Sequence, residues 1–159
     1  YCFILILNLI LNLNLIMNEN IVKFINYCLA FAFTTILLVY IIKVPFILTN
    51  NSPLVTEYYI DNYIANLLLD FFLIGFYILI GLLFIKVFKI EKPSMKLFMI
   101  IIATIMISGG FMLYFLNTKK TSSFFSRWFH SVTYRAVIYD IILVGLTYLV
   151  YKYMNLLII

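Results

Sequence analysis

Asp70 and Asp140 are the residues best placed to do chemistry, because each opens a closely similar phrase inside an apolar stretch. The first phrase reads Asp-Phe-Phe-Leu-Ile-Gly and the second reads Asp-Ile-Ile-Leu-Val-Gly. A carboxylate at mid-bilayer costs about 2.5–3.5 kcal/mol by insertion measurements, so such residues are usually paired or functional. Two of them at similar depth can hold a proton or a cation, or fix helix packing through hydrogen bonds.

The composition indicates that the bilayer is the solvent for this chain. Of its 159 residues, 66% are hydrophobic and 11% are charged, against about 25% charged in an average soluble domain. The net charge of +5 lies in loops and helix ends, which favours anionic lipid headgroups over nucleic acid. Cys2 and Cys28 have no metal-ligand spacing, and no nucleic-acid-binding signature occurs. We therefore expect no metal, no cofactor and no sequence-specific nucleic-acid partner.

Four apolar stretches are long enough to cross a bilayer, which takes about 20 helical residues. They predict an all-α, polytopic membrane protein with a single four-helix transmembrane domain over residues 17–159. The first helix can continue past Pro45 with a kink, and a polar loop is expected from Thr49 to Asp61. The four predicted transmembrane helices cover about residues 21–42, 63–88, 95–116 and 135–154.

Residues 1–16 are interpreted as an apolar extension that is upstream-translated or otherwise non-native. They lack a starting Met and the basic region of a secretory signal, whereas Met17 opens what looks like an ordinary protein start. The alternative is a short fifth apolar helix, although Asn8, Asn12 and Asn14 interrupt it.

An aromatic and basic segment over about residues 122–133 predicts an amphipathic helix before the last transmembrane helix. Phe124, Phe125, Trp128, Phe129 and Val132 recur at the spacing of one helical face. We expect this helix to lie in the headgroup region with Trp128 as its anchor, and the alternative is a hairpin loop with aromatic belt residues. The residues expected to contact lipid or a partner are Lys119, Lys120, Arg127, Trp128, His130 and Arg135.

Counting residues along the four predicted helices places polar or small side chains at one depth, roughly 10 Å inside the membrane. Asp70 and Asp140 enter from the same side, and Asn66 and Tyr77 share the helix face of Asp70. Small residues such as Gly109 allow close helix approach, and hydroxyls can donate to carboxylates. The predicted intramembrane polar layer consists of Asp70, Asp140, Asn66, Tyr77, Ser108, Thr34, Thr35 and Thr147.

Three interpretations of the two aspartates are open. Hydrogen bonds can fix helix register, the pair can form a protonatable or cation-binding site, or both can lie near the interface in water. Arg135 points elsewhere on the helix of Asp140, and it can pair with Asp70 or Glu57 on a neighbouring helix. His130 is the only histidine, and the serines lack the glycines of a nucleophile elbow. An enzyme is therefore not expected.

The last third of the chain carries a resemblance. The run Phe-Phe-Ser-Arg-Trp-Phe-His from Phe124, followed by Tyr-Arg-Ala-Val-Ile-Tyr-Asp from Tyr134, resembles small uncharacterised multi-pass membrane proteins of large DNA viruses that infect algae and protists. The resemblance implies a component of a virion membrane or a host membrane. It carries over no catalytic residue.

The function expected first is that of a non-enzymatic integral membrane protein that organises a membrane or anchors a partner. Its basic segment from Lys119 to Arg135 would hold anionic lipid headgroups or a membrane or capsid protein. The alternative is a small ion- or proton-coupled transporter or channel that uses Asp70 and Asp140. Much lipid-facing surface on a narrow four-helix bundle also favours a homo-oligomer.

Overall fold

The computed structural model describes residues 19–156, and all regular structure within that range is helical. The predicted extension over residues 1–16, together with Met17, lies outside the described residues. Four helical stretches within the range are long and apolar enough to cross a membrane. They are α2 (Glu19–Thr35) continued by the π-helix η1 (Ile36–Ile41), α5 (Tyr63–Val87), α6 (Pro93–Asn117) and α8 (Tyr134–Leu156). The protein is therefore helical and embedded in a membrane, as its composition predicts.

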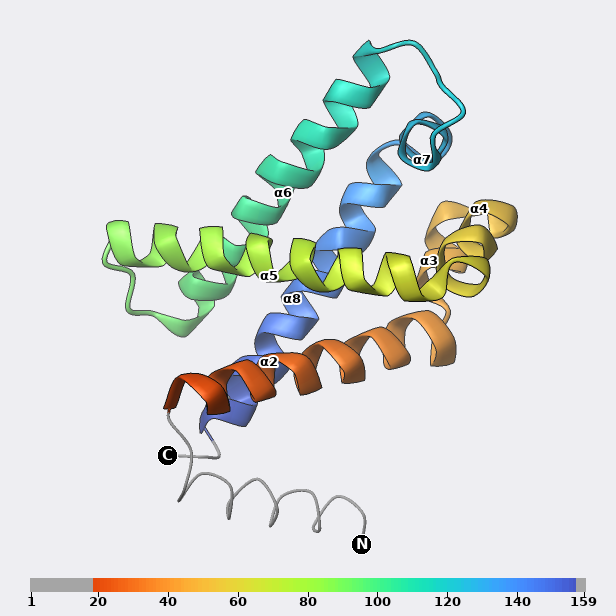
Figure 1. Cartoon of the computed structure of the whole chain (residues 1–159). Helices are drawn as coiled ribbons and strands as arrows, with labels where there is room; N and C mark the ends of the chain where they lie inside the picture. Colours follow the sequence, from red (N-terminus) through yellow and green to blue (C-terminus); the bar gives the residue numbers. More distant parts are fainter. Residues whose placement is uncertain (1–18, 157–159) are drawn as a thin grey trace, which may run out of the picture.

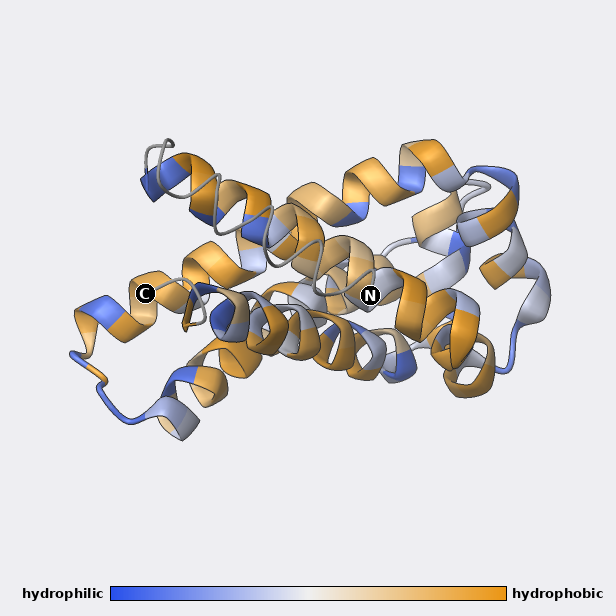
Figure 2. Cartoon of the chain, turned by 90° about the horizontal axis from the view of Figure 1, so that it is seen from below, coloured by the Kyte–Doolittle hydropathy of each residue, from blue (hydrophilic) through white to orange (hydrophobic). Residues whose placement is uncertain are grey.

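The long helices cross the molecule in alternating directions and are splayed (Figure 1). α5 and α6 are joined at one end by a short turn and cross close to it, while α8 packs against both α6 and α2 (Figure 1). Hydrophobic residues cover most of the long helices, whereas hydrophilic residues concentrate at helix ends and in the connections (Figure 2). This distribution is typical of helices whose outer faces contact lipid.

Gly81 of α5 lies where the α5 and α6 backbones approach each other closely. A Cβ atom placed on Gly81 would lie 2.5 Å from Ile100 Cδ1 and 2.9 Å from Ile100 Cα, so no larger residue fits without moving the α6 backbone. A small residue lets two helix backbones approach closely in this way. The close approach expected at Gly109 is wrong, because a Cβ atom there would meet no neighbouring atom within 4 Å among the described residues.

The segment between η1 and α5 is helical, although the sequence predicts a polar loop over most of it. Lys43 adopts a left-handed conformation with φ 60°, so the first membrane helix ends there and does not continue past Pro45. Leu54, Val55 and Tyr59 in this segment are buried, and their apolar area explains why it folds onto the bundle. Its three short helices are α3 (Val44–Thr49), α4 (Ser52–Thr56) and the π-helix η2 (Glu57–Asp61).

The short helix α7 (Phe124–Val132) occupies the predicted segment before α8, with its aromatic face turned toward the bundle. Trp128 is 9% exposed and Phe129 is 7% exposed. The Phe129 ring stacks on Phe115 of α6 with centroids 5.4 Å apart, and Trp128 stacks on Tyr58 of η2 at 6.2 Å. The rings that the sequence assigns to the headgroup region thus pack between α6 and η2. This position removes more of their apolar area from contact with water than the headgroup region would.

Candidate functional site

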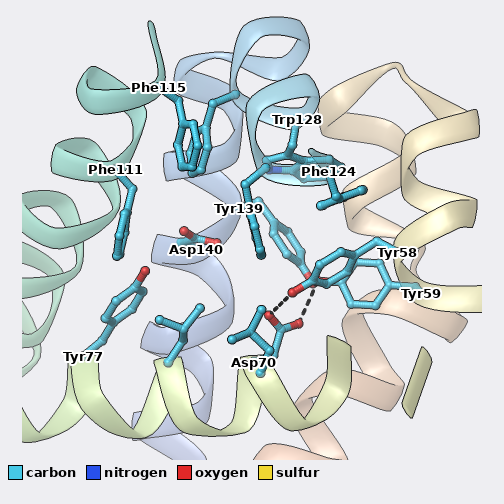
Figure 3. A pocket seen from close by; sticks show the side chains of 14 residues that line it. Tyr58, Tyr59, Asp70, Tyr77, Phe111, Phe115, Phe124, Trp128, Tyr139 and Asp140 are labelled. Atoms are coloured by element: carbon cyan, nitrogen blue, oxygen red, sulfur yellow. Dashed lines mark hydrogen bonds between the residues drawn. The ribbon is translucent and has the colours of Figure 1, made fainter. Parts of the chain in front are cut away.

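A cavity of about 240 Å³ lies among α5, α6, α8, α7 and η2 (Figure 3). Asp70 of α5 and Asp140 of α8 both line it. The sequence left open whether these two side chains face each other, and the structure places both in the lining of one cavity. Aromatic rings form most of the remaining lining: Tyr58, Tyr59, Tyr77, Phe111, Phe115, Phe124, Phe125, Trp128, Phe129 and Tyr139.

Asp70 is held by tyrosines of η2. The Tyr58 hydroxyl donates to Asp70 Oδ1 at 2.7 Å, and the Tyr59 hydroxyl donates to Asp70 Oδ2 at 3.2 Å (Figure 3). The hydroxyls of Tyr59 and Tyr139 lie 2.8 Å apart and share a further hydrogen bond. Burial, followed by the negative charge of Asp70, raises the pKa of both Tyr58 and Tyr59 well above 10. Both phenols therefore remain protonated donors, and both oxygens of Asp70 are occupied.

Asp140 has a sparser environment. Ser108 of α6 donates to Asp140 Oδ2 at 2.6 Å, and no other hydrogen bond from residues 19–156 reaches this carboxyl group. Tyr77 is 4% exposed, and its hydroxyl points into the cavity on the side of Asp140 (Figure 3). That hydroxyl has no hydrogen-bond partner within the described part of the chain. The Tyr77 hydroxyl and one carboxylate oxygen of Asp140 therefore have unused hydrogen-bonding capacity on this side of the cavity.

The other residues of the predicted polar layer do not join one network. Asn66 donates to the Tyr58 carbonyl at 2.9 Å, which ties η2 to the start of α5. Thr147 bonds back to the Leu143 carbonyl of its own helix at 2.7 Å. Thr34 and Thr35 of α2 are buried, do not line the cavity, and have hydroxyls without partners in the described structure: Thr34 Oγ1 and Thr35 Oγ1.

The basic residues of the predicted contact segment divide into two groups. Arg127 forms a two-pronged ion pair with Glu57, which is the partner that the sequence considered for Arg135. Hydrogen bonds from Arg127, assisted by its charge, lower the pKa of Glu57 below its usual value. His130 Nδ1 lies 2.8 Å from the Ser126 carbonyl of its own helix. The members of the group that remains exposed are Lys119, Lys120 and Arg135.

Sequence reasoning missed the tyrosines that hold Asp70. Tyr58 and Tyr59 fall in a segment predicted to be a loop, and Tyr139 lies directly before Asp140 on a different helix face. The one indication in the sequence was their residue type, because a buried tyrosine usually has a hydrogen-bond partner for its hydroxyl. Asn26 of α2 was also missed, and its side-chain amide donates to Asn155 of α8 at 3.0 Å.

The donor set of the cavity does not resemble a metal centre. Within residues 19–156 no group of three His, Cys, Asp or Glu side chains is arranged to hold a metal ion. What the lining offers instead is negative charge beside aromatic faces.

No family model, curated protein or solved structure matches this chain. The fold and the cavity define its class as a multi-pass helical membrane protein with an acidic and aromatic cavity.

Proposed function

We propose that this is a non-enzymatic integral membrane protein that binds a proton or a cation at Asp70 and Asp140, as a small ion- or proton-coupled transporter or channel. The observation that carries the proposal is that both carboxylates, from different membrane helices, line one cavity. Ionisable groups inside a membrane domain that face a shared cavity commonly mark ion or proton pathways.

The hydrogen bonds favour this role over a purely structural one. A carboxylate that only fixes helix register is expected to have donors on both oxygens, because a polar group without partners is costly inside a membrane domain. Asp70 meets this requirement through Tyr58 and Tyr59. Asp140 does not, since Ser108 is its one donor among the described residues. A cation or a bound proton would supply what Asp140 lacks.

The proposal is tested in proteoliposomes that contain the full chain, by measuring proton and potassium flux under an imposed gradient. Asp140→Asn is expected to abolish the flux and Asp70→Asn to reduce it, because each removes a negative charge from the cavity. Glu91→Gln is the matched control, since Glu91 is exposed in the α5–α6 turn and its neutralisation should leave flux unchanged. Flux that is equal in all four proteins, or no flux in the unmodified protein, contradicts the proposal.

A second candidate function is the organisation of a membrane, in a virion or its host, or the anchoring of a partner there. It is supported by the exposure of Lys119, Lys120 and Arg135, which lie on the α6–α7 connection and at the start of α8. Each basic residue near an anionic membrane surface contributes about 1 kcal/mol of attraction. These three residues are the proposed headgroup contacts of this segment, because Trp128 is buried and Arg127 is paired with Glu57.

This second function predicts a lipid effect. Adding anionic lipid to the micelle should raise the thermal stability of the protein, and Lys119→Ala with Lys120→Ala should remove most of that gain at low salt. Equal stabilisation by anionic and zwitterionic lipid, or no change in the double variant, contradicts it.

A further inference from the structure

The cavity has more room than a single small inorganic ion needs, and most of its lining is aromatic. Its volume of about 240 Å³ is several times the about 30 Å³ that one water molecule occupies in the liquid. It is also below the about 300–1,000 Å³ of pockets that take drug-sized ligands. The size suits a molecule with a few carbon atoms.

The walls favour a positive charge on such a molecule. Phe111, Phe115 and Trp128 contribute ring surfaces to the cavity, and a cation within about 6 Å of a ring centroid is attracted by the negative face of the ring. The rings are held in place by stacking: Phe124 on Trp128 at 5.6 Å and Phe115 on Phe129 at 5.4 Å. Fixed rings of this kind lose little entropy when a ligand binds.

The polar groups locate the charge at the Asp140 side. Asp70 already accepts from Tyr58 and Tyr59, so its capacity to accept further hydrogen bonds is reduced. Asp140 accepts from Ser108 alone among the described residues, and the buried Tyr77 hydroxyl points into the same space without a partner (Figure 3). An N–H donor placed here would satisfy both groups.

We propose that the cavity binds a small alkylammonium ion, whose N–H groups contact Asp140 and Tyr77 and whose carbon atoms lie against the aromatic rings of α6 and α7. The inference rests on the proposed function and names the class of its cation. A charge-assisted hydrogen bond to Asp140 distinguishes this ligand from a neutral molecule of the same shape.

The single tryptophan of the chain makes binding directly measurable. Trp128 lines the cavity, so the intrinsic tryptophan fluorescence of the protein in detergent reports on its occupancy. Cyclohexylammonium is the probe, cyclohexanol is its neutral counterpart of similar shape, and potassium is the inorganic control. We expect a saturable fluorescence change with cyclohexylammonium and none with cyclohexanol at equal concentration.

Two variants test the assigned contacts. Asp140→Asn should weaken cyclohexylammonium binding at least about tenfold, as expected for loss of a hydrogen bond to a charged group. Tyr77→Phe should weaken it about two- to tenfold while leaving the fold intact, because that hydroxyl has no partner elsewhere in the described structure. Glu91→Gln should bind as the unmodified protein does. An equal response to cyclohexanol, or unchanged affinity in Tyr77→Phe, overturns the inference.

The outcome is separable from that of the proposed function. Proton or potassium flux that depends on Asp70 and Asp140, without cyclohexylammonium binding, leaves the proposed function standing and rejects the organic cation. Absence of both aspartate-dependent flux and binding rejects both.

Discussion

The two halves of the cavity differ, although a similar phrase opens at each aspartate. In the Asp70 half, two phenols donate to the carboxylate and a third hydroxyl, that of Tyr139, supports them. In the Asp140 half, one serine donates, and the hydroxyl of Tyr77 faces the cavity without a hydrogen-bond partner among the described residues. One half has a hydroxyl donor for each carboxylate oxygen, whereas the other has a carboxylate oxygen and a hydroxyl without hydrogen-bond partners among the described residues.

The difference shows that similarity of sequence between two helices does not give similarity of chemistry. The donors of Asp70 come from η2, a segment before α5, and the donor of Asp140 comes from α6. Each carboxylate is therefore defined by the elements that pack on its helix. A register-fixing role for Asp70 and a binding role for Asp140 are compatible within one cavity, and the predictions below separate them.

The largest effect is expected at the close approach of α5 to α6, where Gly81 faces Ile100. Gly81→Ala places a Cβ atom 2.9 Å from Ile100 Cα, so the α5 and α6 backbones must separate. We expect the free energy of unfolding to fall by about 1–3 kcal/mol, as for overpacking in a core. Thermal unfolding in detergent measures it.

Gly110→Ala is the matched control for this change. A Cβ atom at Gly110 meets no described neighbour within 4 Å, and alanine favours helix by about 1 kcal/mol over glycine. An equal loss of unfolding free energy in the two variants would show that Gly81 does not control the close approach of α5 and α6.

The same substitution should affect stability differently in the two halves. Tyr59→Phe removes one donor from the Asp70 half and should lower the free energy of unfolding by about 1–3 kcal/mol, since it leaves a part-buried carboxylate oxygen without its donor. Tyr77→Phe breaks no hydrogen bond in the described structure and should leave stability nearly unchanged. If Tyr77→Phe is as destabilising as Tyr59→Phe, the two halves are alike and the comparison fails.

Acid should weaken the contact between η2 and α7. Glu57 begins η2, which carries Tyr58 and Tyr59, and it pairs with Arg127 of α7. Hydrogen bonds from Arg127 lower the pKa of Glu57 from 4.5. A carboxyl group with a depressed folded-state pKa adds stability above its unfolded pKa, and the contribution is lost as the pH falls through the folded value.

The stability of the unmodified protein should therefore decline as the pH falls below about 4.5. Both side chains are about one-third exposed, so the effect is small. Glu57→Gln should remove this part of the decline and lower stability slightly at neutral pH. An unchanged acid profile in Glu57→Gln would show that the ion pair does not support η2.

The smallest effect is expected at the junction between α7 and α8, on the Asp140 side. Thr133 has φ 53°, which a β-branched residue rarely adopts. Thr133→Gly should raise the free energy of unfolding by up to about 1 kcal/mol by relieving this strain. Thr118→Gly is the control, because Thr118 has φ −101° and gains nothing from glycine. A loss of stability in Thr133→Gly would contradict the strain.

Hydropathy and helix length predict the membrane class and the four long helices, because the bilayer sets both requirements. The aspartates stand out for the same reason, since a charge is costly there. The tyrosines of η2 could not be found, because polar residues such as Asn50 and Asn51 make that segment resemble a loop. The direction of Trp128 was also hidden, because an amphipathic pattern shows which residues share a face and not what covers that face.

We propose that the cation contacts Asp140 more directly than Asp70, and parallel titrations of Asp70→Asn and Asp140→Asn test this most directly. Both proteins keep Trp128 in the cavity wall, so its fluorescence reports cyclohexylammonium binding in each. We predict that Asp140→Asn loses at least about tenfold in affinity, while Asp70→Asn loses less. Equal losses, or a greater loss in Asp70→Asn, would contradict the account.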